Sequence, residues 1–292
     1  MDALSPQPGP YGDTRTGLSG PLTAVMTCKG RLAHLQQSLP RLAALEGLSI
    51  VVVDYECPDH AGDWVRRHFP QVEVVMVPDA SEFSIARARN LGAAQVHTPW
   101  IAFIDADVLV DPGFLHGAMP LLQEGSFLVA DPCPHELAGF LVCRRDDFRR
   151  VGGYDDVFTG WGSEDRDLCV RLERLGARRR PFPSAALQSL PHTDADRTRF
   201  HAITDRFVSL RINGMYFQIK HDLARLTGLP DLPQQDRVAL YARVRDQVLA
   251  RPGDACQIDA ALPARCDFLQ PPDWRLRRMI RYRFEPTEPS AP

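Results

Sequence analysis

Short apolar runs alternate with amphipathic segments through the first part of the chain. The apolar runs are rich in β-branched residues, which is typical of strands buried on both faces of a parallel sheet. They cover residues 22–28, 49–54 and 72–77, and a further run starts at Trp100. The intervening segments repeat apolar residues at helical spacing. Strands and helices that alternate in this way predict an α/β fold with parallel β-α-β units and right-handed crossovers.

The pattern is less regular after Trp100. Two strand-like runs occupy 127–130 and 139–143, and a helix is predicted over 168–175 because leucines recur on one of its faces. Ser163 is the expected N-cap of that helix. A short strand is predicted to end at His192. The region from Trp100 to His192 is therefore expected to add further strands to the sheet.

Changes in composition suggest the domain boundaries. Residues 1–20 are rich in Pro, Gly, Ser and Thr and are expected to be a flexible lead-in. Residues 21–195 form the expected α/β domain, with a nucleotide-binding half at 21–110 and an acceptor or catalytic half at 111–195. Helical periodicity followed by a proline-rich tail predicts a helical extension over 196–292.

Composition narrows the classes of function. A chain of 292 residues with 44% hydrophobic content can bury a large core, and its net charge of −3 provides no basic field for nucleic acid. No apolar run reaches the roughly 18 residues of a membrane span, so we expect a soluble, cytoplasmic protein. Seven scattered cysteines without a C-x-x-C pair indicate neither a disulfide framework nor a zinc knuckle. The cationic run 275–283 is compatible with a surface patch or an anionic-lipid contact.

Carboxylates follow the strand that starts at Trp100. Asp105 and Asp107 lie two residues apart, so in extended geometry they point the same way and suit a hard divalent cation. The alternative is an Asp-rich turn in which Asp111 caps the next helix. Because ligands of parallel sheets bind beyond the carboxyl ends of the strands, Thr27 and Asp54 are expected near this acid pair.

Glycine-rich phosphate loops are missing from the sequence, which disfavours dinucleotide oxidoreductases and P-loop enzymes. A bound nucleotide diphosphate would then need a metal and side-chain donors. Arg87 and Arg89 on the helix at 84–95 are candidates, and the alternative is that both lie on a solvated helix face.

A second acidic segment is Gly160-Trp-Gly-Ser-Glu-Asp165. Acids in the first turn of a helix interact favourably with its dipole, and capping explains one or two of them. It does not explain the aromatic residue between two glycines, which suits a ring stacked under a ligand. Glu164 and Asp165 are therefore candidate chemical groups and Trp161 a candidate platform.

Together these segments resemble a known family. Asp54, the run Ala86-Arg-Ala-Arg-Asn-Leu-Gly92, the pair Asp105-Ala-Asp107 and the Gly160–Asp165 segment resemble the family-2 glycosyltransferases of the GT-A fold. The Trp-Gly-x-Glu-Asp element looks like the C-terminal half-domain of β4-galactosyltransferases and bacterial chondroitin-type polymerases. The resemblance covers roughly residues 20–195 and implies a mainly parallel sheet flanked by helices.

The resemblance also implies roles for individual residues. Asp165 would be the catalytic base, Glu164 would bind donor or acceptor hydroxyls, and His192 would complete a Mn²⁺ or Mg²⁺ site with Asp107. Asp105 would contact ribose or the metal. The other donor-binding residues implied by the resemblance are Thr27, Cys28, Arg31, Asp54, Arg87, Asn90, Ala106, Trp161 and Gly162. The implied reaction is a single displacement that inverts the anomeric carbon.

Three departures from the family pattern affect the expected donor. Tyr55-Glu-Cys-Pro-Asp-His60 replaces the usual Ser-x-Asp element, Cys28-Lys-Gly-Arg31 replaces Asn-Arg, and Ser163 replaces a glycine. A UDP-hexose or UDP-N-acetylhexosamine is favoured, and GDP-mannose is the alternative donor. The acceptor is expected to be a carbohydrate, a lipid-linked molecule or a small molecule, and the extension could mediate a homodimer.

Two other functions would require different sequence features. A nucleotidyltransferase of the same fold would open with a Gly-rich G-x-G-T-R-like loop, which this sequence lacks. A non-catalytic carbohydrate-binding or partner-binding protein on a transferase scaffold is the alternative from another class. That alternative predicts the loss of an acid or of the histidine, whereas Asp105, Asp107, Asp165 and His192 are all present.

Overall fold

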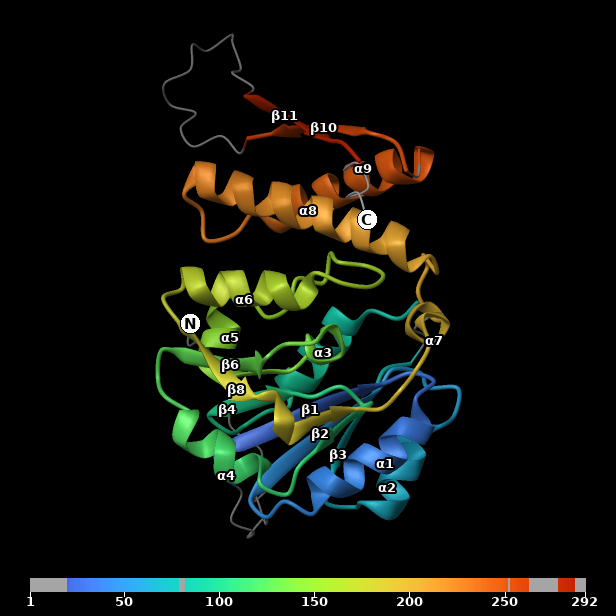
Figure 1. The fold of residues 1–292 in the computed structure, drawn as a ribbon, viewed down its shortest axis with the longest axis vertical. Helices are drawn as coiled ribbons and strands as arrows, with labels where there is room; N and C mark the ends of the chain where they lie inside the picture. The colour runs from blue at the N-terminus through green and yellow to red at the C-terminus, as the bar shows by residue number, and fades with distance from the viewer. Residues whose placement is uncertain (1–19, 79–81, 252, 263–277, 287–292) are drawn as a thin grey trace, which may run out of the picture.

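The computed structural model describes residues 20–78, 82–251, 253–262 and 278–286. Its lower part in Figure 1 is a seven-stranded sheet with the order β3-β2-β1-β4-β7-β6-β8. Helices cover both faces of the sheet. Side chains of α1, α2 and α4 pack on one face, and side chains of α3, α5 and α6 pack on the other. The prediction of an α/β fold, with a mainly parallel sheet flanked by helices, is confirmed.

The first half of the sheet is parallel, as its β-α-β pattern predicts. Strands β1, β2, β3 and β4 pair in parallel, and helices follow the first three of them. These elements are β1 (Leu22–Cys28), α1 (Leu32–Ala43), β2 (Leu48–Asp54), α2 (Ala61–His68), β3 (Glu73–Met76), α3 (Ile85–Ala94) and β4 (Trp100–Phe103).

The second half adds antiparallel strands. β7 runs antiparallel to β4 and β6, and β8 is parallel to β6. A separate pair, β5 and β9, is antiparallel and lies beside the end of β4. These elements are β5 (Val108–Val110), α4 (Phe114–Ala118), η1 (Met119–Leu121), β6 (Ser126–Asp131), η2 (His135–Leu137), β7 (Leu141–Arg144), α5 (Arg145–Arg150), α6 (Glu164–Arg174), β8 (Arg178–Pro183), η3 (Ser184–Ala186) and β9 (Leu187–Ser189).

The start of α6 agrees with the predicted N-cap position. The helix begins at Glu164, directly after Ser163, and continues through the apolar stretch predicted over 168–175. Glu164 and Asp165 therefore lie in its first turn, as predicted. Ser163 itself has a φ of 78° in the left-handed region, and its side chain makes no capping hydrogen bond. A capping serine normally has extended backbone, so the position is as predicted but the side-chain cap is absent.

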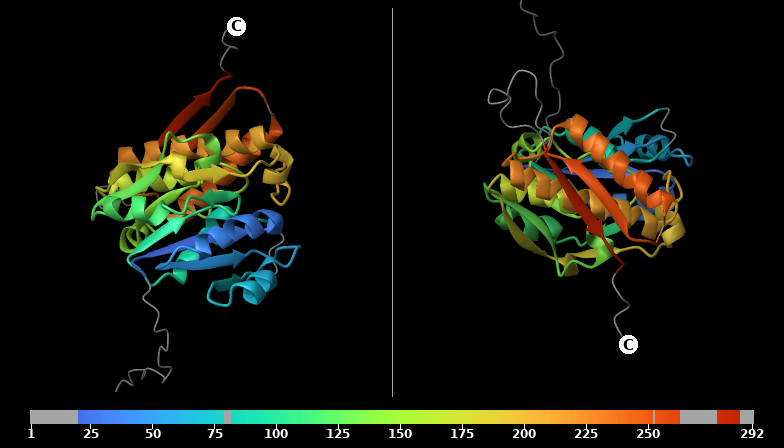
Figure 2. Two further views of the ribbon diagram at one scale, coloured as in Figure 1. Left: turned by 60° about the horizontal axis from the view of Figure 1, so that its bottom comes forward. Right: turned by 90° about the horizontal axis from the view of Figure 1, so that it is seen from above.

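The C-terminal segment contains α7 (Asp194–Thr198), α8 (Arg206–Thr227) and α9 (Gln234–Ala250), followed by β10 (Cys256–Ala261) and β11 (Met279–Phe284). In Figure 1 α7 lies at the side of the α/β part, and the later elements form a second layer above α6. Figure 2 shows the antiparallel pair β10–β11 lying across α8 and α9. These two strands were not predicted. No helix in the described part of the chain has the length and apolar character needed to cross a membrane.

The cationic run 275–283 is only partly described. Residues 275–277 lie outside the described ranges, as do residues 1–19 of the expected lead-in. Within β11, Arg281 pairs with Asp259 of β10 at 2.7 Å, and Arg283 pairs with Glu285 at 2.7 Å. Both of these arginines therefore have acidic partners, which compensate part of the positive charge of the run.

The C-terminal layer has its own apolar core. Buried side chains of α8, α9 and β10 pack together, and Val157 and Phe158 from the α/β part belong to the same cluster. An ion cluster also joins the two parts, because Lys220 of α8 contacts Asp155 and Asp167 at 2.7 and 2.6 Å. The C-terminal segment therefore packs against residues 155–158, which precede α6.

Candidate active site

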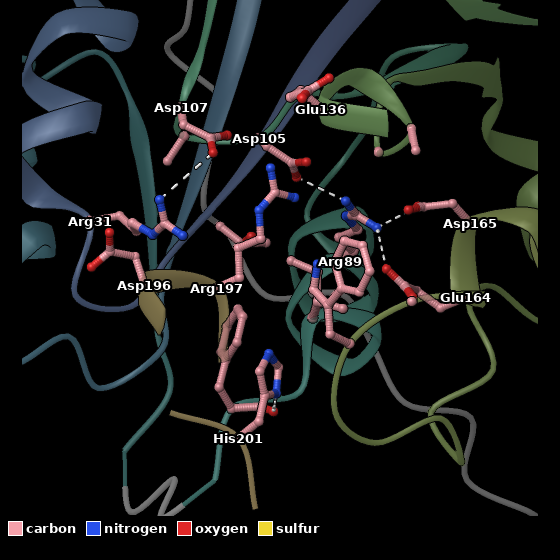
Figure 3. Close-up of a pocket in the computed structure, with 18 of the residues that line it drawn as sticks. Arg31, Arg89, Asp105, Asp107, Glu136, Glu164, Asp165, Asp196, Arg197 and His201 are labelled. Carbon is pink, nitrogen blue, oxygen red and sulfur yellow. Dashed lines mark hydrogen bonds and ion pairs between the residues drawn. The ribbon is translucent and has the colours of Figure 1, made fainter. Parts of the chain in front are cut away.

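A cavity of about 320 Å³ opens beyond the carboxyl ends of β1 and β4. It is lined by Thr27 at the end of β1, by the Asp105–Asp107 segment after β4 and by the start of α6. Side chains from α7 and the loop before α8 close another side of it (Figure 3). This is the place where an open α/β sheet binds its ligand.

Arg89 of α3 lies at the centre of the cavity wall (Figure 3). One of its guanidinium nitrogens donates to Asp105 Oδ1 at 2.8 Å, and another donates to Asp165 Oδ1 at 2.5 Å and lies 3.6 Å from Glu164 Oε1. Burial acts to lower the pKa of Arg89, but Asp165 and the other neighbouring acids outweigh it and hold the pKa well above its ordinary value. Arg89 therefore remains a fixed cation between two groups of carboxylates.

Asp165, the candidate general base, faces the cavity from the first turn of α6. Its side chain lines the cavity and is 18% exposed. Burial raises the pKa of Asp165 well above the usual range, the Arg89 guanidinium opposes that rise, and the Glu164 charge adds to it. A carboxylate with a raised pKa binds a proton more readily than a free aspartate and still ionises as the pH increases. Glu164 is buried beside it.

Asp107 and His192 meet on the opposite side of the cavity. Asp107 Oδ2 lies 3.1 Å from His192 Nδ1 and 3.7 Å from a guanidinium nitrogen of Arg31. The antiparallel pairing of β5 with β9 brings them together, and Leu190 N–H donates to Asp107 O at 2.7 Å. Burial and the Asp105 charge raise the pKa of Asp107, while His192 and Arg31 lower it.

The Asp107–His192 pair partly fits a divalent metal site. Carboxylate oxygen and imidazole nitrogen are suitable ligands for Mn²⁺, and a Mg²⁺ or Mn²⁺ ion in phosphate chemistry often takes only one or two protein ligands plus substrate oxygens. Among the described residues, no group of three potential ligands lies close enough to hold an ion without such oxygens. The pair thus suits a metal that arrives with a diphosphate.

Asp105 takes a different position from Asp107. Its carboxylate is bonded to Arg89, on the side of the cavity that also holds Asp165. Ala106 lies between the two acids and lines the cavity, and its carbonyl accepts a hydrogen bond from Ser38 Oγ at 2.7 Å. The two acids of the expected pair therefore contact different partners.

Trp161 and Gly162 also line the cavity. The guanidinium carbon of Arg206 lies 4.3 Å from the centre of the Trp161 ring, and that of Arg197 lies 5.5 Å from it. Cations at such distances are attracted to the electron-rich face of an indole. The arginines come from the C-terminal segment, so that segment shapes the aromatic side of the site.

Two expected donor-binding residues lie away from the cavity lining. Asp54 is almost fully buried, and its two carboxylate oxygens accept hydrogen bonds from Cys57 N–H and Gly62 N–H at 2.6 Å each. The carboxylate thereby closes the loop after β2. Cys28 is also buried, with its sulfur 3.9 Å from Cys57 Sγ. Asp54 and Cys28 therefore contact the loop after β2 and do not line the cavity. Cys28 directly follows Thr27, which does line it.

Two further expected residues on α3 point elsewhere. Arg87 is exposed, in agreement with the solvated-face alternative, whereas Arg89 is buried in the site. The Asn90 side chain donates to Tyr154 O at 2.9 Å and accepts from Tyr154 N–H at 2.8 Å. Asn90 therefore ties α3 to the loop before α6 and does not line the cavity.

Several cavity residues had no signal in the sequence. They lie after β1, at or just before the start of α3, and in the segment after β9. Their positions follow from tertiary packing, which the local sequence pattern does not specify. They are Lys29, Phe83, Ile85, Arg197, Phe200, His201 and Leu210.

Comparisons with known proteins point to one enzyme class. A family model described as the N-terminal domain of galactosyltransferase matches residues 126–200. The pre-mycofactocin glycosyltransferase of Mycobacterium tuberculosis is 29% identical in an alignment 206 positions long, and the match covers 57% of this chain and 43% of that protein. This chain therefore spans less than half the length of that relative.

Solved structures of the same fold include transferases with bound donors. Staphylococcus aureus TarS 1–349 in complex with UDP-GlcNAc superposes with a TM-score of 0.57 at 12% identity, covering 76% of this chain and 72% of that one. The mannosyltransferase PcManGT from Pyrobaculum calidifontis in complex with GDP-Man and Mn²⁺ has a TM-score of 0.52 at 15% identity, covering 79% and 75%. The chain has the fold of GT-A glycosyltransferases, and its sequence relatives support assignment to the glycosyltransferases as an enzyme class.

Proposed function

We propose that this protein is a metal-dependent glycosyltransferase that moves a hexose or N-acetylhexosamine from a UDP-sugar to an acceptor hydroxyl with inversion. The observation that carries the proposal is the position of Asp107, His192 and Asp165 around one cavity. The first two face one side and the third, bonded to Arg89, faces the other. The comparisons support sugar transfer, and the metal, the inversion and the donor are part of the proposal.

Asp107 and His192 would hold a divalent ion against the diphosphate of the donor. When bound, such an ion stabilises the negative charge that develops on the leaving diphosphate. Arg31, 3.7 Å from Asp107, is placed to contact the same phosphates or to pair with the carboxylate when no donor is present. These residues supply binding and charge compensation, and no proton transfer is required from them.

Asp165 would take the proton of the acceptor hydroxyl as the new glycosidic bond forms. The hydroxyl oxygen attacks the anomeric carbon, the bond from that carbon to the diphosphate oxygen breaks, and the proton passes to Asp165. A well-placed general base contributes about 10²–10⁴-fold in rate. Arg89 keeps Asp165 oriented toward the cavity, and attack from the side opposite the leaving group gives inversion.

A GDP-mannose donor is the second candidate. Asp54, which the family resemblance assigns to the nucleotide base, is already bonded to two backbone N–H groups of its own loop. Asp54 is therefore not available for the base contact that the resemblance implies. PcManGT, which has a related fold, binds GDP-Man in its solved structure. Base contacts would then come from Thr27 and its neighbours in the cavity lining.

The test is a screen of UDP- and GDP-sugars by thermal shift with and without Mn²⁺. A ligand that binds only the native state raises the melting temperature, and about 2.7 kcal/mol is gained at 100 times the dissociation constant. Slow hydrolysis of the stabilising donor without acceptor would then be assayed. We expect one donor class to stabilise the protein only with the metal and to be hydrolysed slowly.

Substitutions separate catalysis from simple binding. Asp107→Ala is expected to abolish the metal-dependent shift, whereas Asp165→Asn is expected to retain donor binding and lose turnover. Asp146→Ala removes an exposed acid outside the cavity and serves as the matched control. If no nucleotide sugar stabilises the protein, the proposed function is wrong, and if turnover persists in Asp107→Ala, the assignment of Asp107 to the metal is wrong. Binding without turnover under all conditions would favour the non-catalytic carbohydrate-binding alternative.

A further inference from the structure

One face of α8 lies against the loop that carries Trp161. In Figure 1 this helix lies directly above α6, whose first turn follows that loop. Arg206, Ser209, Leu210 and Asn213 are spaced three, four and seven positions from the first, so they share one face of the helix. Each of them contacts the segment Thr159–Gly162 or the Trp161 ring.

The contact consists of hydrogen bonds to the loop backbone. Trp161 N–H donates to Ser209 Oγ at 2.7 Å, and the Ser209 hydroxyl lies 3.3 Å from Trp161 O. The Asn213 amide donates to Thr159 O at 3.1 Å and to Trp161 O at 3.2 Å. Both backbone groups of Trp161 therefore find partners on α8.

A third side chain fixes the amide of Asn213. The Tyr241 hydroxyl of α9 lies 3.0 Å from Asn213 Oδ1 and 2.7 Å from Thr159 Oγ1. Ser209, Asn213 and Tyr241 are 1%, 0% and 5% exposed. Water cannot replace a lost partner at such buried positions, so each bond holds the loop more firmly than an exposed bond would.

Close approach adds to this constraint. Gly160 has a φ of 77°, and a Cβ built on it would lie 2.2 Å from Ser209 Oγ. A Cβ on Gly162, whose φ is 98°, would lie 2.7 Å from Leu210 Cδ2. With no side chain between the loop backbone and the helix, the position of α8 determines the position of Trp161.

We propose that Ser209 and Asn213 are positioning residues for sugar transfer, acting through Trp161 and the Glu164–Asp165 turn that follows it. The proposal rests on the proposed function of the cavity. Neither residue is among those that line the cavity, so neither touches the substrates in this assignment. A misplacement of about 1 Å in an active site can cost about 100-fold in rate, which is why a buried backbone clamp affects catalysis.

The experiment compares Ser209→Ala with Thr227→Val. Thr227 is the matched control because its buried hydroxyl, at the other end of α8, donates to Leu223 O at 2.7 Å and lies far from the cavity lining. Both variants lose one buried hydroxyl of the same helix. We expect kcat/KM for transfer to fall about 10- to 100-fold in Ser209→Ala and less than threefold in Thr227→Val. The affinity for nucleoside diphosphate with Mn²⁺ is expected to be the same in both variants.

The state of the Trp161 ring is measured separately. Protein labelled with 5-fluorotryptophan gives a ¹⁹F resonance for Trp161, identified by its disappearance in Trp161→Phe. In Ser209→Ala and in Asn213→Ala this resonance is expected to shift or broaden, whereas it keeps its position in Thr227→Val. If Asn213→Ala does not fold, Ser209→Ala decides the result.

The outcomes distinguish this inference from the proposed function. Equal activity in Ser209→Ala and Thr227→Val, or an unchanged Trp161 resonance in Ser209→Ala, would overturn the positioning role. A wild-type protein that transfers no sugar from any donor would overturn the proposed function. In that case a Trp161 resonance that moves in Ser209→Ala and Asn213→Ala but not in Thr227→Val would still establish that α8 positions the loop.

Discussion

Replacing Lys220 with methionine tests the ion cluster that joins α8 to the α/β part. Lys220 Nζ is fully buried and lies 2.7 Å from Asp155, 2.6 Å from Asp167 and 3.2 Å from Asp231. Two guanidinium groups complete the cluster, since Arg171 pairs with Asp167 at 2.7 Å and Arg237 pairs with Asp155. Three cations thus balance three carboxylates.

Methionine has a similar length but no charge, so this variant leaves three carboxylates facing two cations. Removing one partner from a buried charge group typically costs 3–5 kcal/mol, because the remaining charge is uncompensated. Proteins of this size lose about 2–4 °C of melting temperature per kcal/mol, so a decrease on the order of 10 °C is expected. That loss is a large fraction of a total stability of about 5–15 kcal/mol.

Urea unfolding at pH 7.5, followed by far-UV circular dichroism, measures this loss. Arg225→Ala is the control, because Arg225 lies on the same helix, is exposed and pairs only with its neighbour Asp222 in the described structure. Its unfolding midpoint is expected to match that of the wild type. A Lys220→Met protein within 1 kcal/mol of the wild type would refute the view that this cluster holds α8 in place through paired charge.

Three further predictions concern the site. Asp107→Asn is expected to abolish the extra thermal stabilisation that Mn²⁺ adds to a nucleoside diphosphate, and an undiminished Mn²⁺ effect would contradict the metal assignment. Transfer needs Asp165 ionised, so kcat/KM should fall as the pH drops through the raised pKa of Asp165. Arg89→Met removes the cation that opposes the rise of this pKa. In that variant the fall of kcat/KM on the acid side of the pH profile should therefore occur at a higher pH. A hydrogen bond from Cys28 lowers the pKa of Cys57 to about 6, so alkylation of Cys57 should have a midpoint near that pH. In Cys28→Ala the midpoint should rise, and an unchanged value would exclude the sulfur contact as its cause.

The sheet could be predicted because its signal is local. The strands β1 and β2 are uninterrupted apolar runs, and the structure gives 22–28 and 48–54 for predicted 22–28 and 49–54. Their order and parallel pairing follow from the intervening helices. Because the ends of parallel strands share one edge, the positions of Thr27 and the Asp105–Asp107 segment at the cavity also followed from the sequence.

Side-chain direction could not be predicted in the same way. Asp54 ends a strand just as Asp105 follows one, yet Asp54 bonds its own loop while Asp105 faces the cavity. Similarly, Arg87 and Arg89 are two positions apart on α3, and only the second faces inward. These choices depend on the neighbouring loop and helix, which the local sequence pattern does not specify.

The contribution of the C-terminal segment also depends on tertiary structure. Ser209 and Asn213 look like ordinary polar positions of a helix, and their role is visible only when the Trp161 backbone lies against them. The strands β10 and β11 pair with each other and were not predicted, because the composition of this region indicated a proline-rich tail.

The packing of Phe158 explains why sequence boundaries and structural boundaries differ here. Phe158 belongs to the α/β part by sequence, but its ring contacts Tyr216 of α8 with a centroid distance of 4.9 Å and is buried in the C-terminal core. Tyr216 in turn donates a hydrogen bond to Asp155 at 2.8 Å, just ahead of Phe158. Separating the two parts would break the bonds of Asp155 to Tyr216 and Lys220 and would expose the Phe158 ring, and exposing that apolar surface costs free energy. The loop that presents Trp161 to the cavity is therefore stabilised from its C-terminal side, and the fold of the extension is a condition for the geometry of the site.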